Sequence, residues 1–85
     1  GDEFAILLPR TGVAEARHVA AGLCEAIRGV RLEHRGRTVS TTASIGVARL
    51  AGGDPRQLMI DADLAMYAAK GAGRDTVRAQ LPAAA

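Results

Sequence analysis

Aromatic residues and cysteine are scarce in this 85-residue chain, and each scarcity excludes a class of function. The only aromatic side chains are Phe4 and Tyr67, and tryptophan is absent. The chain therefore offers no base-stacking platform of the kind that binds single-stranded nucleic acid. Cys24 is the only cysteine, so an intramolecular disulfide is impossible, and its place in a helical pattern is typical of a small buried side chain.

A long apolar run is also missing. No apolar stretch approaches the roughly 20 residues that a membrane-spanning helix needs, and the first residues do not follow the pattern of a signal peptide. The segment is therefore predicted to be soluble and cytoplasmic, with no direct membrane insertion. A membrane anchor on another part of a longer protein stays open.

The composition is that of one small globular domain. Hydrophobic residues make up 48% of the chain and charged residues 24%, which argues against a disordered segment. The net charge is +2, but the basic residues are spread along the chain, which favours a solvated surface over a nucleic-acid interface. Every cationic residue except Lys70 is an arginine, so Lys70 is the only lysine.

The pattern of apolar residues predicts the element order β-α-β-β-α-β. Residues 4–8 form an unbroken apolar run closed by Pro9, which is typical of a central strand covered on both faces. Thr11 or Gly12 can cap a helix that ends near Gly29. Its apolar positions recur at spacings of three and four and form one face: Val13, Ala16, Ala20, Leu23, Ile27 and Val30.

A hairpin, a second helix and an edge strand are expected in the rest of the chain. Residues 30–33 and 38–50 are predicted strands joined by a turn at residues 34–37. Residues 54–69 are predicted to form a helix, with Asp at its cap, Pro in its first turn and Gln in the capping-box position. Residues 76–78 are short and rich in β-formers, which indicates an edge strand.

The predicted strand over residues 38–50 alternates apolar and small polar residues. Gly46 removes a side chain from its interior, which indicates a bulge or an element packed closely against the backbone. The serine and threonine residues on the same face fit a polar ligand face or ordinary solvent exposure, and we favour exposure.

In the second helix we expect these residues to be buried: Leu58, Ala62, Ala65, Met66 and Ala69.

Two adjacent carboxylates stand at the start of the chain. Asp2 and Glu3 follow Gly1, and their side chains could face one cation only if the backbone turns there, which Gly1 allows. Carboxylate oxygens suit Mg²⁺, which takes one or two of them and fills its other positions with water and phosphate. Glycine and aspartate are also common in plain turns, so these residues alone leave both interpretations open.

Lys70 and Arg74 lie four residues apart at the end of the second predicted helix. Cations there can compensate the helix dipole and bond to free carbonyls. They can also hold phosphate, lysine as a point charge and arginine as a two-pronged donor. The other polar candidates are interpreted as structural, packing or solvated groups: Asp61, Asp63, Tyr67 and His18.

Residues 1–4, Gly-Asp-Glu-Phe, resemble the second half of the Gly-Gly-Asp-Glu-Phe signature of the GGDEF, or diguanylate cyclase, family. Residues 44–48 look like the family's downstream strand, and residues 61–75 look like its last helix and the turn that follows. The chain is identified as a member that matches the C-terminal half of the domain. The resemblance implies an α+β fold, a mostly antiparallel sheet with two helices packed on it, as part of a nucleotide-cyclase palm-like domain.

The resemblance also implies a reaction. Two domains, each holding one GTP, would meet as a homodimer and form cyclic di-GMP, a bacterial second messenger, under the control of an upstream sensory or regulatory domain. Two Mg²⁺ ions per active site are implied, with Mn²⁺ as an alternative. Asp2 and Glu3 would be catalytic and carry the metal, Gly1 would let the backbone approach the nucleotide, and Lys70 and Arg74 would hold its phosphates.

The chain departs from the family in two respects. Family members usually have Asn after the phosphate-binding Arg, whereas this chain has Asp75, whose charge would oppose phosphate unless it points away. The match also begins inside the signature, so the upstream metal-binding Asp, the guanine-recognising residues and any Arg-x-x-Asp inhibitory site are not in the sequence. We expect residues 1–80 to be the C-terminal part of a GGDEF domain and residues 81–85 a tail. The 85-residue chain alone is expected to be inactive, and residues 4–8 to pair with another copy.

Two other classes of function were considered. A non-catalytic GGDEF-like module that binds GTP or only a protein partner would be favoured by loss of either carboxylate, and both are present. A small basic nucleic-acid binder is disfavoured by the scattered charge and the missing aromatics. A steep salt dependence of DNA or RNA binding would favour that class.

Overall fold

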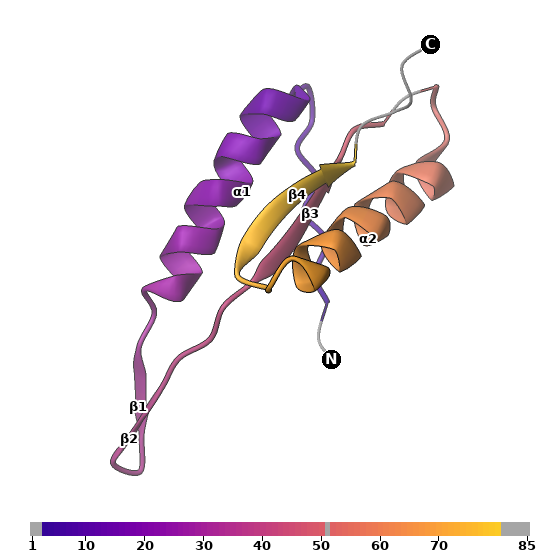
Figure 1. Ribbon diagram of the computed structural model, residues 1–85. Coiled ribbons are helices and arrows are strands. Elements are labelled where there is room, and N and C mark those ends of the chain that lie inside the picture. Colours follow the sequence, from indigo (N-terminus) through magenta and orange to yellow (C-terminus); the bar gives the residue numbers. More distant parts are fainter. Residues whose placement is uncertain (1–2, 51, 81–85) are drawn as a thin grey trace.

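The computed structural model describes residues 3–50 and 52–80 (Figure 1). In chain order the elements are helix α1 (Val13–Arg28), strands β1 (Leu32–His34), β2 (Arg37–Val39) and β3 (Ser44–Ala48), helix α2 (Pro55–Gly71) and strand β4 (Thr76–Gln80). The α+β class and both predicted helices are confirmed. Gly1, Asp2 and the predicted tail over residues 81–85 lie outside the described residues.

The two helices begin in different ways. Gly12 precedes α1 in an extended conformation, and no side chain caps that helix. Asp54 caps α2, because its Oδ1 accepts a hydrogen bond of 3.0 Å from the Arg56 backbone N–H. The predicted capping box is wrong, since Gln57 Nε2 instead donates to Asp61 Oδ1 at 2.9 Å. The start of α2 is therefore encoded locally, whereas α1 depends more on its packing against the strands.

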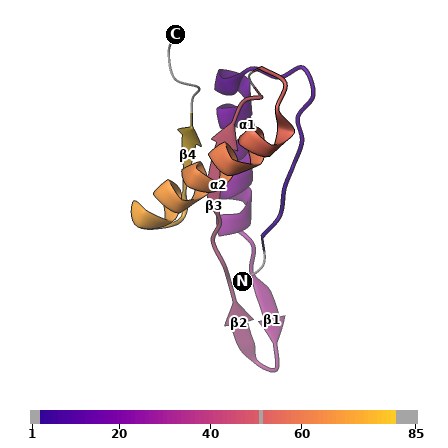
Figure 2. The same ribbon diagram turned by 90° about the vertical axis from the view of Figure 1, so that its right-hand side faces the viewer.

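The strands form two separate two-stranded ladders. β1 and β2 pair antiparallel as the predicted hairpin, which projects away from the rest of the molecule (Figures 1 and 2). β3 and β4 pair parallel, with Ile45 opposite Val77. The prediction of one long strand over residues 38–50 is wrong in its middle, because residues 40–43 belong to neither ladder.

Gly46 lets α2 lie directly against β3. A Cβ atom at Gly46 would clash with the Ala62 carbonyl oxygen and the Met66 amide nitrogen, and would lie 2.8 Å from the Ala65 carbonyl carbon. These are backbone atoms, which cannot swing aside as the end of a side chain can. Ala65 and Ala69 of α2 are almost completely buried. The predicted close packing against the Gly46 backbone is confirmed, and it fixes the distance between β3 and α2.

Helix α1 covers the opposite side of the β3–β4 pair (Figure 1). Ile45 and Val47 point away from α2, because side chains alternate across a strand. On that side Cys24 is only 3% exposed, as predicted, and its Sγ lies 3.5 Å from the Ala43 carbonyl oxygen. The buried apolar residues are all small or medium-sized: Ala20, Cys24, Val47, Ala65 and Ala69. No helix among the described residues has the length and hydrophobicity needed to cross a membrane.

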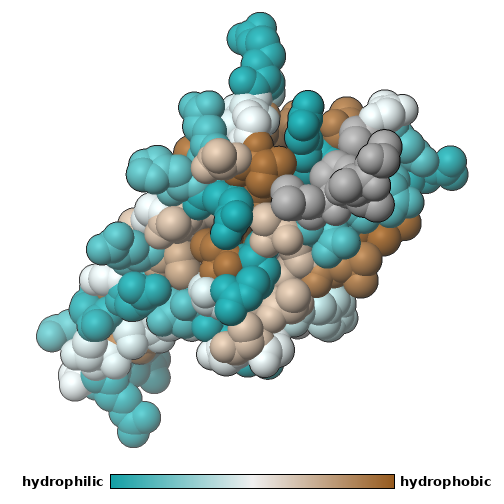
Figure 3. All heavy atoms as spheres, turned by 45° about the horizontal axis from the view of Figure 1, so that its top comes forward, coloured by the Kyte–Doolittle hydropathy of each residue, from teal (hydrophilic) through white to brown (hydrophobic). Residues whose placement is uncertain are grey.

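The segment of residues 3–8 is extended but is not a strand, which corrects the prediction of a central strand over residues 4–8. It makes no backbone hydrogen bond to any other described residue. Phe4, Ile6 and Leu7 are 91%, 67% and 78% exposed, so the segment is not covered on both faces. A strand requires a hydrogen-bonded neighbour, which this segment lacks within the described part of the chain. Hydrophobic side chains also remain visible between polar ones elsewhere on the surface (Figure 3).

Candidate functional site

The acidic start of the chain lies beside the end of α2. Glu3 Oε2 is 3.9 Å from Lys70 Nζ. The same Nζ lies 5.6 Å from the centroid of the Tyr67 ring, one turn earlier in the helix. The side chains of Glu3 and Lys70 are 58% and 33% exposed, so this long ion pair is solvated and contributes little to stability. Both charged groups are therefore accessible to a ligand.

Arg74 stands in a tight turn directly after α2. Gly73, Arg74 and Asp75 all have positive φ angles, of 108°, 63° and 50°. The Arg74 backbone N–H donates to the Ala69 carbonyl oxygen at 3.1 Å, which ties the turn to the end of the helix. Left-handed conformations cost non-glycine residues about 1–3 kcal/mol each, so they persist only where neighbouring structure fixes them.

An ion pair with α1 fixes this turn. Arg28 Nε donates to both carboxylate oxygens of Asp75, at 3.0 and 2.9 Å. This hydrogen bond, together with the attraction of the carboxylate, raises the pKa of the Arg28 guanidinium. Cys24 Sγ lies 3.7 Å from Asp75 Oδ1 on the same side. The Asp75 carboxylate is thus directed toward α1 and neutralised there, which is the orientation in which it would not oppose an anion at Arg74.

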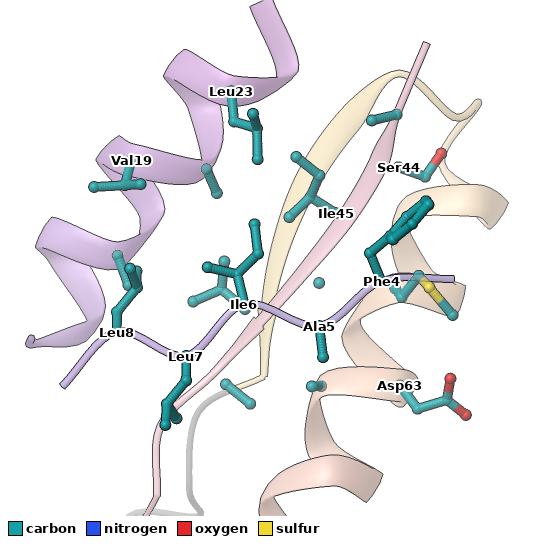
Figure 4. Close-up of a pocket in the computed structure, with 18 of the residues that line it drawn as sticks. Phe4, Ala5, Ile6, Leu7, Leu8, Val19, Leu23, Ser44, Ile45 and Asp63 are labelled. Atoms are coloured by element: carbon teal, nitrogen blue, oxygen red, sulfur yellow. The ribbon is translucent and has the colours of Figure 1, made fainter. Parts of the chain in front are cut away.

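Glu3, Lys70 and Arg74 line one groove, together with Asp63 of α2. Figure 4 shows Asp63 near Phe4, at the end of the groove where the chain begins. Apolar residues line much of the rest, and Figure 4 shows these: Ile6, Leu8, Val19, Leu23 and Ile45. The groove therefore has a charged end, where the carboxylates of Glu3 and Asp63 and the cations of Lys70 and Arg74 lie. The rest of the groove is mainly apolar but is also lined by Arg10 and Arg49.

Glu3 is the only predicted metal ligand whose position is described, since Asp2 lies outside the described residues. Within residues 3–50 and 52–80, no three His, Cys, Asp or Glu residues come together so that they could hold a metal ion. A single carboxylate still fits Mg²⁺, which takes one or two protein carboxylates and completes its shell with water and phosphate oxygens. The chemistry of Glu3 is thus compatible with magnesium brought in with a phosphate ligand.

Two of the other polar candidates, Asp61 and His18, have the surroundings that the sequence indicated, whereas Tyr67 does not. Asp61 accepts the hydrogen bond from Gln57 within α2. His18 is exposed on α1, as predicted. Tyr67 is 62% exposed with its ring centroid 5.6 Å from Lys70 Nζ, so it is not the packing residue that the sequence indicated. The Tyr67–Lys70 contact could have been found from its helical spacing of three, whereas nothing in the sequence pointed to the pairing of Arg28 with Asp75.

Comparison with known proteins points to one family. Residues 1–76 match the family model for the diguanylate cyclase GGDEF domain. The chain is 40% identical over 82 residues to the diguanylate cyclase TpbB of Pseudomonas aeruginosa, covering 92% of this chain and 19% of TpbB. It is 36% identical over 81 residues to the response regulator PleD of Caulobacter vibrioides, covering 91% of this chain and 18% of PleD. It is also 36% identical over 76 residues to the diguanylate cyclase DgcP of P. aeruginosa, covering 88% of this chain and 11% of DgcP.

The chain therefore spans less than a fifth of the length of these curated relatives. The family match nevertheless covers nearly the whole chain, from the Gly-Asp-Glu-Phe motif through α2 to the turn that carries Arg74. The family expected from the sequence motifs is thus confirmed by an independent comparison. This chain belongs to the diguanylate cyclase GGDEF domain family.

Proposed function

We propose that these residues form part of a domain that condenses two molecules of GTP into cyclic di-GMP, with release of pyrophosphate. The observation that carries the proposal is the approach of Glu3 to Lys70 in the groove that Arg74 also lines. A carboxylate that suits magnesium lies beside one cation that suits phosphate, and a second such cation lines the same groove, which supports binding of a magnesium nucleotide. Membership of the cyclase family supports the same substrate.

In the proposed reaction the 3′ hydroxyl of each GTP attacks the α-phosphorus of the other. A new P–O bond forms, the bond to pyrophosphate breaks, and the hydroxyl proton leaves to a carboxylate or to water. Bound Mg²⁺, two ions per site with Mn²⁺ as an alternative, would activate the hydroxyl and neutralise developing charge. Asp2 and Glu3 would hold the metal and help to activate the hydroxyl, and Gly1 would let the backbone approach the nucleotide.

Lys70 and Arg74 hold the phosphates in this proposal. Lys70 supplies a compact charge from the end of α2, and it would exchange its long contact with Glu3 for a phosphate oxygen. Arg74 offers a planar fork from a turn that Asp75 and Arg28 hold in place. Phosphoryl transfer depends mostly on positioning and charge neutralisation, so these contacts matter as much as the carboxylates do.

The proposal requires partners. Each domain holds one GTP, so a homodimer of domains is needed to bring two nucleotides together. Control by a regulatory domain in a longer protein is supported by the name of one relative, the response regulator PleD. We place the activity in the cytoplasm, where GTP is available, and propose no nucleic acid as partner. The 85-residue chain alone should not turn over, because the groove beside its charged end is lined largely by apolar groups that cannot recognise guanine.

The test is a hybrid enzyme in which this chain replaces the segment of TpbB that aligns with it. We expect the hybrid to convert GTP and Mg²⁺ to cyclic di-GMP, and its Glu3→Gln variant and the isolated 85-residue chain to make none. Circular dichroism and thermal unfolding would show that each protein is folded. A folded hybrid that binds GTP without forming product would contradict the cyclase and indicate a non-catalytic GTP-binding module.

A further inference from the structure

The position of Arg74 depends on two residues that lie outside the groove. Among the described residues Arg74 lines the groove, whereas Arg28 and Asp75 do not. Arg28 is the last residue of α1, and Asp75 directly follows Arg74 in the turn between α2 and β4. Figure 1 shows the end of α1 and this turn at the same end of the β3–β4 ladder. Any contact of Arg28 with a ligand in the groove is therefore indirect, through the turn.

The turn needs support because two of its residues have an unfavourable backbone conformation. Arg74 and Asp75 have φ angles of 63° and 50°, in the left-handed region that residues with a Cβ atom disfavour. The Arg74 N–H donates to the Ala69 carbonyl oxygen at 3.1 Å, which fixes the turn to α2. The Asp75 carboxylate accepts from Arg28 Nε at 3.0 and 2.9 Å, which fixes the turn to α1.

The fold holds the two cations of the groove in different ways. Lys70 lies in the last turn of α2, where the helix itself sets the direction of the side chain. Arg74 lies beyond the helix, so its direction depends on the turn. The side chains of Arg28 and Asp75 are 51% and 33% exposed, so their ion pair is partly solvated and adds little to global stability. The main effect of the ion pair is therefore on the turn that carries Arg74.

We propose that Arg28 and Asp75 are positioning residues for nucleotide binding, which hold Arg74 in the orientation that reaches the phosphates. The ligand is the magnesium nucleoside triphosphate of the proposed function, so the proposal rests on that function. Direct attraction of the phosphates by the two charges is the competing explanation. The two explanations differ at Asp75, because loss of its negative charge should weaken binding if Asp75 positions Arg74, and should strengthen binding if only long-range attraction acts.

The first test examines the turn without any nucleotide. In the 85-residue chain, amide hydrogen exchange followed by NMR reports how often the Arg74 N–H leaves its bond to Ala69. Arg28→Ala should raise the exchange rate of this amide by about fivefold or more, whereas amides in the middle of α2 should change little. The matched control is Arg17→Ala, because Arg17 is an exposed arginine of the same helix outside the groove. Equal exchange at Arg74 in the two variants would overturn the proposal.

The second test measures binding of a non-hydrolysable GTP analogue with Mg²⁺ to the TpbB hybrid by isothermal titration calorimetry. Arg28→Ala and Asp75→Asn should each raise the dissociation constant by about threefold or more, but by no more than Arg74→Ala does, because a preorganised contact is lost. Arg28→Lys keeps a charged donor and should recover part of this loss, and Arg17→Ala should leave the dissociation constant unchanged. In the Arg74→Ala background, Arg28→Ala should cause no further loss, because it acts through Arg74.

Circular dichroism of every variant should match the wild-type hybrid, which separates loss of Arg74 positioning from loss of the fold. Three results would overturn the proposal and leave the proposed function intact: tighter binding in Asp75→Asn, an unchanged dissociation constant in Arg28→Ala, or an equal effect of Arg28→Ala with and without the Arg74 side chain. A folded hybrid that does not bind the analogue at all would instead overturn the proposed function, and with it this role of Arg28.

Discussion

Replacing Gly46 with alanine should destabilise the chain far more than the addition of one methyl group suggests. The new Cβ would clash with the Ala62 carbonyl oxygen and the Met66 amide nitrogen, and would lie 2.8 Å from the Ala65 carbonyl carbon. All three atoms belong to the backbone of α2, so the clash can be relieved only if the helix moves away from β3. Such a movement opens the contact that buries Ala65 and Ala69, the least exposed residues of the core.

The expected loss in free energy of unfolding can be estimated. Overpacking of a core usually costs about 1–3 kcal/mol, and we expect about 3 kcal/mol here because helix backbone has to move. A domain of this size has a total stability of roughly 4–13 kcal/mol, so this loss is a large part of it. At about 4–8 °C per kcal/mol, the melting temperature should fall by roughly 12–24 °C.

The matched control is Gly22→Ala, which adds the same atoms to α1. A Cβ atom at Gly22 meets nothing within 4 Å, and alanine favours the helix over glycine by about 0.5–1 kcal/mol. Thermal and urea unfolding followed by circular dichroism should therefore show opposite shifts for the two variants. A Gly46→Ala variant within about 0.5 kcal/mol of the wild type, which is the range of ordinary surface changes, would refute the reasoning.

Three further experiments test individual contacts of the fold. Asp54→Ala should lower the free energy of unfolding by about 1 kcal/mol through loss of the α2 cap, whereas Asp54→Asn should retain most of it; equal losses in urea unfolding would contradict the cap. Arg28→Ala and Asp75→Asn should each lower the melting temperature, and the double variant should lose less than the sum of the two single losses, because both substitutions break the same ion pair. In 1 M salt this difference should shrink. A double variant whose loss equals the sum would argue against the ion pair. The Cys24 thiol should react with a thiol reagent only as fast as the chain opens, and immediate reaction of the folded chain would contradict its burial.

The helices were predictable because their signals are local. Apolar residues at spacings of three and four marked α1, and an Asp-Pro start marked α2, so the signal and the structure lie within a few residues of each other. The close packing at Gly46 was also predictable, because a glycine in a strand interior leaves room for a neighbour. The identity of that neighbour, α2, was not.

Strand pairing was less predictable, because a strand is defined by a partner that can lie anywhere in the sequence. Residues 4–8 have the composition of a strand and lack a hydrogen-bonded neighbour among the described residues. Residues 40–43 alternate like the strand that follows them, but no strand in the described part of the chain pairs with them. Composition alone could not show either result.

The candidate site was also predictable from the sequence only in part. The residue types of Glu3, Lys70 and Arg74 indicated metal and phosphate chemistry, but only their resemblance to a family linked them, because no spacing rule connects the two ends of a chain. The structure adds the contact of Glu3 with Lys70 and the partner of Asp75. The pairing of Arg28 with Asp75 depends on how α1 packs beside the turn after α2, which local patterns do not determine.

The central claim is that the acidic start of the chain and the cations after α2 act on one magnesium nucleotide. Its most direct test is the rate of cyclic di-GMP formation by the TpbB hybrid carrying Lys70→Ala or Arg74→Ala, with Arg56→Ala as control. Arg56 is an exposed arginine near the other end of α2, outside the groove. Loss of a charge-assisted phosphate contact, worth about 1.5–3 kcal/mol, should lower kcat/KM for GTP roughly tenfold or more in each of the first two variants. The control should stay within a factor of two, and equal rates for all three variants would contradict the claim.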